Sequence, residues 1–196
     1  MGNSKQLTLR VMIEAAFLAA FAMVLDLLPS ITLAPFVSIS FSMVPVFIVS
    51  IRWGWKAGMF SGFMWGLLQV VTGDVAFLNA IQFLIEYFIA FACVGFSGLL
   101  APAVQSSLED GQKGKAMAWM LVAVWVGSIA RYVWHFIAGI IFWGSYAPAG
   151  MSAFWYSFIF NGGAMLGSGL FCSIVLVVLT RTSARLIAHR NAFTHS

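Results

Sequence analysis

Long apolar stretches alternate with short polar or turn-forming segments along the whole chain. The apolar stretches predict six helices, at about residues 8–28, 39–51, 56–72, 79–101, 115–144 and 152–180. The segments between them contain proline, glycine or charged residues, which typically end helices. A membrane-spanning helix needs about 20 apolar residues, so the second and third stretches are short for a span.

Composition supports a membrane interpretation of these helices. The chain has 196 residues, of which 62% are hydrophobic and 8% charged, and its mean hydropathy is +0.97. Soluble domains carry about 25% charged residues. The apolar run from Val11 to Leu28 is longer than a signal-peptide core and lacks a clear cleavage site, so we interpret it as the first membrane helix. The sequence therefore predicts an all-α integral membrane bundle of six transmembrane helices, with residues 1–196 as a single domain.

Basic residues predict the orientation of the bundle. Nine of the ten lie at or beyond those ends of the predicted helices that fall on one side of the bundle: Lys5, Arg10, Arg52, Lys56, Lys113, Lys115, Arg181, Arg185 and Arg190. The opposite loops, 29–38, 73–78 and 145–151, contain no Lys or Arg. By the positive-inside rule both termini are cytoplasmic, in a multi-pass protein of the plasma membrane. Basic residues scattered in this way do not indicate nucleic-acid binding.

Three polar residues on three different helices are predicted to lie at one depth. From the helical rise, Glu86, His135 and Asn161 lie about 10–14 Å below the outer ends of helices 4, 5 and 6. Polar and ionisable groups within a membrane usually face a protein interior or a cavity. We therefore expect a shared polar site in the outer half of the bundle, with Glu86 as its only deep acidic residue.

Helical spacing extends this site. Arg131, His135, Gly139 and Trp143 recur every fourth residue and so share one face of helix 5, where Gly139 could leave room for a flat ligand. Gln82 and Glu86 share a face of helix 4 in the same way. Glu86 and Arg131 could instead form a purely structural ion pair.

Aromatic residues gather above the predicted site: Trp143, Tyr146, Phe154, Trp155 and Tyr156. They could form an interfacial belt or a cage for an organic cation. A carboxylate, ring-nitrogen and amide groups and stacking rings together suit an aromatic, nitrogen-rich cation of vitamin size. We find no nucleophile–base pair, phosphate-binding loop, metal-ligand spacing or ATP-binding module, and this disfavours the alternative of an intramembrane enzyme.

Several motifs resemble the substrate-binding S components of energy-coupling factor (ECF) vitamin transporters, most closely the thiamine-specific members. They are Ile85-Glu86-Tyr87, the pattern His135-x3-Gly139-x3-Trp143, Tyr156-x4-Asn161 and the segment 50–58. The resemblance implies that thiamine is the ligand and that no cofactor is required. An S component for another vitamin or for a thiamine precursor is the alternative.

The resemblance also implies roles for individual residues. The thiamine site would consist of Glu86, Tyr87, His135, Gly139, Trp143, Tyr156 and Asn161, with Arg131 standing where the family has a lysine. The Ala15-x3-Ala19 face of helix 1 would dock the membrane-embedded T component, and two ATPase subunits would complete the transporter. The loop 29–38 would be a lid, although it contains no Trp, and Phe36 is its nearest aromatic.

Overall fold

The computed structural model describes residues 8–28, 30–34 and 37–188, so Lys5, Arg190 and Phe36 lie outside the described residues. Helices α1 (Leu9–Asp26), α2 (Val44–Trp53), α3 (Trp55–Thr72), α7 (Lys113–Phe142) and α8 (Ala153–Thr182) are regular. Between α3 and α7 runs one long helical segment, Ala80–Glu109. It comprises α4 (Ala80–Phe83), the π-helix η1 (Leu84–Ile89), α5 (Ala90–Cys93), the 3-10 helix η2 (Val94–Leu100) and α6 (Ala101–Glu109). Two short 3-10 helices, η3 (Gly144–Tyr146) and η4 (Ala184–Leu186), follow α7 and α8.

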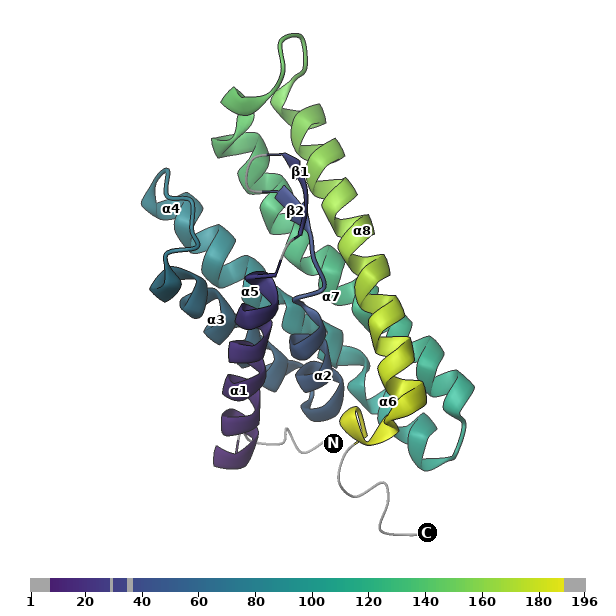
Figure 1. Ribbon diagram of the computed structural model, residues 1–196. Coiled ribbons are helices and arrows are strands. Elements are labelled where there is room, and N and C mark those ends of the chain that lie inside the picture. Colours follow the sequence, from purple (N-terminus) through teal and green to yellow (C-terminus); the bar gives the residue numbers. More distant parts are fainter. Residues whose placement is uncertain (1–7, 29, 35–36, 189–196) are drawn as a thin grey trace.

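The prediction of a helical membrane bundle is confirmed. Three helical segments are long and apolar enough to cross a membrane: Ala80–Glu109, Lys113–Phe142 and Ala153–Thr182. Helices α1 and α3 have 18 residues each and α2 has only 10, so α2 is too short to span on its own. Helix α1 begins and α8 ends at the same, lower end of the bundle in Figure 1.

Two predicted helix boundaries are wrong. The fourth helix does not end at residue 101 but continues to Glu109, through Pro102. Proline is tolerated there because Pro102 stands in the first turn of α6, where its missing N–H is not needed. The second helix begins at Val44 and not at residue 39, because Ile39 belongs to a strand.

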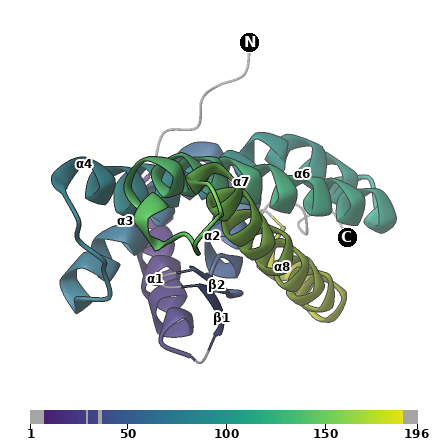
Figure 2. The same cartoon turned by 90° about the horizontal axis from the view of Figure 1, so that it is seen from above.

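The segment between α1 and α2 forms a β-hairpin. Strands β1 (Ile31–Ala34) and β2 (Val37–Ile39) pair antiparallel, with Ile31 opposite Ile39 and Thr32 opposite Ser38. Seen from above, the hairpin lies between α1 and α8 (Figure 2), and both strands contact α8. The predicted lid is thus an ordered two-stranded element, covering 31–34 and 37–39, at the upper part of the bundle.

Glycines on α3 allow close contact with the long helical segment. A Cβ added at Gly58 would lie 2.8 Å from the Gly95 Cα, and one at Gly62 would lie 2.9 Å from the Phe91 carbonyl carbon. Gly66 meets the backbone of Tyr87 in the same way. The small-residue spacing of α3 therefore serves internal packing, since close backbone approach strengthens helix–helix contact in a membrane.

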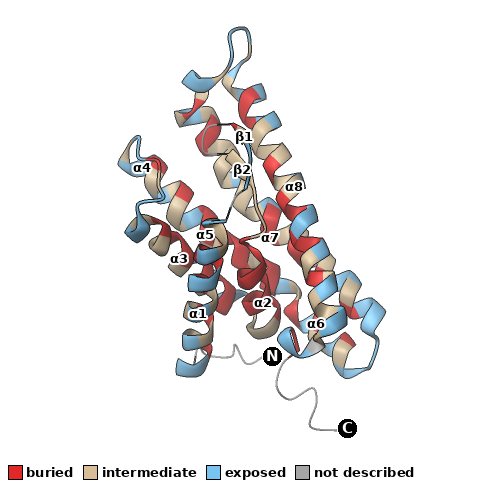
Figure 3. Ribbon diagram, viewed as in Figure 1, coloured by how far each residue is buried: buried red, intermediate tan, exposed pale blue. Residues whose placement is uncertain are grey.

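The predicted docking role of the Ala15–Ala19 face is wrong, because both residues are fully buried. This face of α1 packs against α3, and the Ser61 hydroxyl donates a hydrogen bond of 2.9 Å to the Ala15 carbonyl oxygen. Figure 3 shows buried residues on the inward faces of the helices and exposed ones outside. The exposed face of α1 instead carries Ile13, Phe17 and Ala20.

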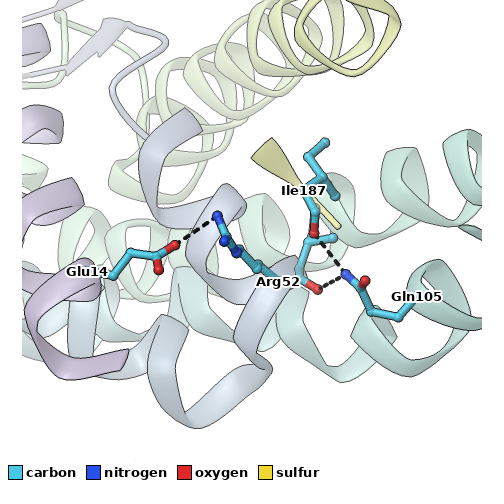
Figure 4. Close-up of polar contacts among 5 residues, drawn as sticks. Glu14, Arg52, Gln105 and Ile187 are labelled. Carbon is cyan, nitrogen blue, oxygen red and sulfur yellow. Dashed lines mark hydrogen bonds and ion pairs between the residues drawn. The ribbon is translucent and has the colours of Figure 1, made fainter. Parts of the chain in front are cut away.

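Polar contacts close the lower end of the bundle (Figure 4). Arg52 forms an ion pair of 3.1 Å with Glu14, which joins α2 to α1. The Gln105 side-chain amide donates hydrogen bonds of 2.9 Å to the carbonyl oxygens of Ile51 and Ile187. These bonds connect α2, α6 and the segment after α8, so the lower end is held together by three side chains that join four parts of the chain.

Packing of α1 against α3 generates the first prediction. Replacing Ala15 with Trp should lower the free energy of unfolding by about 2 kcal/mol or more, because a bulky ring cannot fit a fully buried site between two helices. Thermal unfolding in detergent measures this change. The matched control is Ala20→Trp on the exposed face, which should change stability by no more than about 0.5 kcal/mol. Equal stability of the two variants would contradict the observed packing of α1.

Candidate functional site

A cavity of about 540 Å³ lies in the upper half of the bundle. All the residues predicted for the site line it: Glu86, Tyr87, Arg131, His135, Gly139, Trp143, Tyr156 and Asn161. They come from the π-helix η1, from α7 and the residue that ends it, and from α8. The structure therefore brings the predicted residues together, while their role in binding a ligand stays a prediction.

Glu86 is buried and held by two side-chain donors. It lies in the π-helix η1, and such wide turns are frequent at functional sites. The Trp143 indole N–H donates to Oε1 over 2.9 Å, and the Gln82 side-chain amide donates to Oε2. The Gln82 amide is oriented by the loop before α4, because its oxygen accepts from the Leu78 N–H and its nitrogen also donates to the Ala76 carbonyl, each over 3.1 Å. The carboxylate is thus fixed in place.

Tyr87 joins the same loop to the π-helix. Its hydroxyl oxygen accepts a hydrogen bond of 2.7 Å from the Ala76 N–H. The Tyr87 ring packs near Phe83 and Phe91, with ring centroids 5.3 and 6.0 Å away. Tyr87 therefore both lines the cavity and anchors the loop between α3 and α4 above it.

Arg131 is held by aromatic rings and does not form the ion pair with Glu86 that the sequence left open as an alternative. Among the described residues, Arg131 makes no direct ion pair with a carboxylate. Its guanidinium lies over the rings of Phe91 and Trp65, at 4.3 and 4.7 Å from their centroids. Arg131 Nε donates to His135 Nε2 over 3.4 Å. With Nε2 accepting, the neutral imidazole carries its proton on Nδ1 and can donate there.

Gly139 has a packing role that the sequence did not predict. A Cβ added at Gly139 would lie 2.9 Å from the Asn161 amide nitrogen and 3.0 Å from the Ser157 Cβ. The Ser157 hydroxyl donates to the Phe136 carbonyl over 2.7 Å and accepts from the Asn161 amide over 3.1 Å. Gly139 therefore lets α7 and α8 approach each other, although it also borders the cavity.

Burial divides the aromatic residues at the upper end into two groups. Trp143 and Tyr156 are 8% and 6% exposed, and both line the cavity. Tyr146, Phe154 and Trp155 are between 46% and 56% exposed and face outward. The two alternatives from the sequence thus apply to different residues, since the exposed three suit an interfacial belt and the buried two border the site.

Asp26 is a second acidic residue of the cavity, so the expectation that Glu86 is the only deep acidic residue is wrong. Asp26 ends α1 and lines the cavity. Its carboxylate accepts hydrogen bonds from the Trp65 indole N–H over 2.8 Å and from the Gln69 amide over 2.5 Å. The signal was available, because an acidic residue inside an apolar helix is a candidate functional residue by itself.

The β-hairpin borders the cavity on a further side. Thr32, Val37 and Ser38 contribute to its lining. Ala34 belongs to a small apolar cluster with Ala76, Trp143 and Tyr156. The hairpin therefore packs on Trp143, which donates to Glu86, and forms part of the cavity wall.

The cavity lining combines polar, charged and aromatic groups. Within residues 8–28, 30–34 and 37–188, no three His, Cys, Asp or Glu side chains cluster as metal ligands would. Cys93 and Cys172 are buried free thiols outside the cavity lining. Three carboxylates, a guanidinium, an imidazole and two amides surround an aromatic-walled space, which suits recognition of a polar aromatic molecule.

Comparisons with known proteins agree with this arrangement. A family model described as thiamine transporter protein (Thia_YuaJ) matches residues 12–188. The chain is 38% identical over 189 residues to the thiamine transporter ThiT of Bacillus subtilis (strain 168), covering 95% of this chain and 97% of that protein. It is 34% identical over 199 residues to the thiamine transporter ThiT of Lacticaseibacillus paracasei (strain ATCC 334), covering 100% and 98%.

A solved structure of ThiT from Listeria monocytogenes has the same fold. Its TM-score is 0.88 at 38% sequence identity, and the match covers 92% of this chain and 98% of that chain. These relatives are transporters from bacteria, so the alternative of an intramembrane enzyme is set aside. On the family match over residues 12–188 and the full-length relatives, the chain is a multi-pass membrane transport protein that belongs to the thiamine transporter protein family.

Proposed function

We propose that this protein binds thiamine in the described cavity and serves its uptake into the cell. The observation that carries the proposal is Glu86, a carboxylate held by Trp143 and Gln82 at the wall of an aromatic-lined cavity. Thiamine joins a positively charged ring to a nitrogen-rich aromatic ring. The carboxylate would attract the positive ring, while Trp143 and Tyr156 would contact ring faces.

The remaining polar groups suit the second ring of thiamine. His135 can donate from Nδ1, because its Nε2 accepts from Arg131. The Asn161 side chain can accept and donate, and its amide is already oriented by Ser157. An aminopyrimidine presents ring nitrogens that accept and an amino group that donates. The cavity therefore complements both parts of thiamine, and this supports thiamine over a vitamin without a cationic ring.

We further propose that the protein works as the S component of an ECF-type transporter, beside a membrane T component and two ATPase subunits. The chain contains no nucleotide-binding motif, so uptake against a gradient would need an energy-supplying partner. The lower end of the bundle carries Arg10, Arg52, Lys113 and Arg181, which the positive-inside rule places in the cytoplasm. The cavity would then open toward the outside.

Replacing Glu86 with Gln should weaken thiamine binding by about 2 kcal/mol or more, because the ligand loses a charge-assisted contact in a dry pocket. Calorimetric titration of the purified protein measures the affinity. Glu109→Gln is the matched control, since Glu109 is exposed at the end of α6, and it should bind like the unaltered protein. An unchanged affinity of the Glu86 variant would remove Glu86 from the site.

Replacing Trp143 with Phe should weaken thiamine binding by about 1–2 kcal/mol, because the ring remains but Glu86 loses an indole donor. Trp143→Ala should weaken it further and should also reduce quenching of tryptophan fluorescence by thiamine. The control is Trp155→Phe, which alters an exposed aromatic residue. Normal binding by a folded Trp143→Ala protein would show that Trp143 does not contribute to thiamine binding.

Liposomes containing only this protein should bind thiamine but should not concentrate it. Adding the T component, the two ATPase subunits and internal ATP should produce accumulation of labelled thiamine beyond the amount of protein present. A matched preparation with a non-hydrolysable ATP analogue controls for binding alone. Accumulation against a gradient by the single chain would contradict the proposed partnership.

A further inference from the structure

The cavity contains two carboxylates that are held by the same kinds of donor. Glu86 accepts from the Trp143 indole and the Gln82 amide. Asp26 accepts from an indole and an amide as well, those of Trp65 and Gln69. Only Asp26 has a third donor among the described residues, the Ser40 hydroxyl at 3.4 Å. Each oxygen of both carboxylates thus accepts from a protein donor, but Asp26 accepts from one donor more than Glu86 does, so Glu86 keeps more capacity for a ligand.

The guanidinium of Arg131 lies on the Asp26 side of the cavity. Trp65 connects them, because its ring face contacts the guanidinium at 4.7 Å and its N–H donates to Asp26. Arg131 and Asp26 also interact electrostatically across this ring. The single positive charge lining the cavity is therefore associated with Asp26.

The charges of the cavity then sum to a value that matches a monovalent cation. Its charged lining residues are Asp26, Asp74, Glu86 and Arg131. Asp74 is exposed at the end of α3, where water and salt screen its charge. If Asp26 compensates Arg131, one negative charge remains in the interior, on Glu86. Without Asp26, Arg131 would compensate Glu86 and the interior would be neutral.

We propose that Asp26 is the counter-charge of Arg131, and that it determines the specificity of the site for a positively charged ligand by leaving Glu86 uncompensated. This inference rests on the proposed thiamine-binding function. Asp26 acts through the charge balance of the cavity and needs no contact with the ligand.

The test compares thiamine with deazathiamine, a neutral molecule of nearly the same shape in which carbon replaces the charged ring nitrogen. Calorimetry gives both affinities for the purified full-length protein and for Asp26→Asn. The substitution should weaken thiamine binding about tenfold, as expected for removing one charge at this range in a protein interior. It should leave deazathiamine binding within about threefold, because a neutral ligand does not respond to the lost charge.

Three further variants make the result specific. Asp26→Glu keeps the charge and should retain the unaltered preference for thiamine. Glu109→Gln removes an exposed charge outside the cavity lining and should change both affinities less than about threefold. The double variant Asp26→Asn with Arg131→Gln removes both charges of the pair and should restore much of the preference for thiamine over deazathiamine. The ratio of the two affinities is independent of the fraction of protein that is folded.

Each outcome is distinguishable. An equal loss of both ligands in Asp26→Asn would show that Asp26 only supports the structure, and would overturn the inference while leaving the proposed function intact. Unchanged binding of both ligands would overturn it as well. An unaltered protein that binds neither ligand would overturn the proposed function and this inference together.

Discussion

A carboxylate inside a membrane protein must be surrounded by hydrogen-bond donors or by a positive charge, because its transfer from water is costly. Glu86 meets this requirement through Trp143 and Gln82. Much of the upper half of the structure follows from those two donors. Gln82 has to be oriented by the loop at residues 76–78, and Trp143 has to lie at the end of α7 facing the π-helix.

Close approach of backbones makes this arrangement possible. Gly62 and Gly66 bring α3 against the helix that carries Glu86, and Gly139 brings α7 against α8. These contacts place hydrogen-bond donors on one helix within reach of acceptors on another. Since apolar side chains gain little by leaving lipid, such close packing and internal hydrogen bonds are what hold the helices together. The same packing that stabilises the bundle therefore shapes the cavity.

The sequence predicted the helices and most cavity residues for two reasons. Hydropathy indicates which segments lie in the membrane, and residues spaced four apart share one face of a helix. The spacing of Arg131, His135, Gly139 and Trp143 did place them at one cavity. What failed depended on contacts between segments. Whether Ala15 faces a partner or α3 is decided by the rotation of α1 about its own axis. The sequence leaves this rotation open, because Ala15 and Ala19 form one Ala-x3-Ala pattern and the adjacent Ala16 and Ala20 form another. The hairpin was missed because its strands have only four and three residues and the sequence between them contains Pro35. Pro102 suggested a helix end, but proline is tolerated in the first turn of α6. The single-domain prediction for residues 1–196 stays a prediction.

The most direct test of this account is an experimental structure of the protein determined with saturating thiamine. The account predicts thiamine inside the cavity, with its positively charged ring beside Glu86, its other ring within hydrogen-bonding distance of His135 and Asn161, and Asp26 still bound to Trp65 and Gln69. Thiamine located elsewhere, or a cavity that stays empty at saturation, would contradict it.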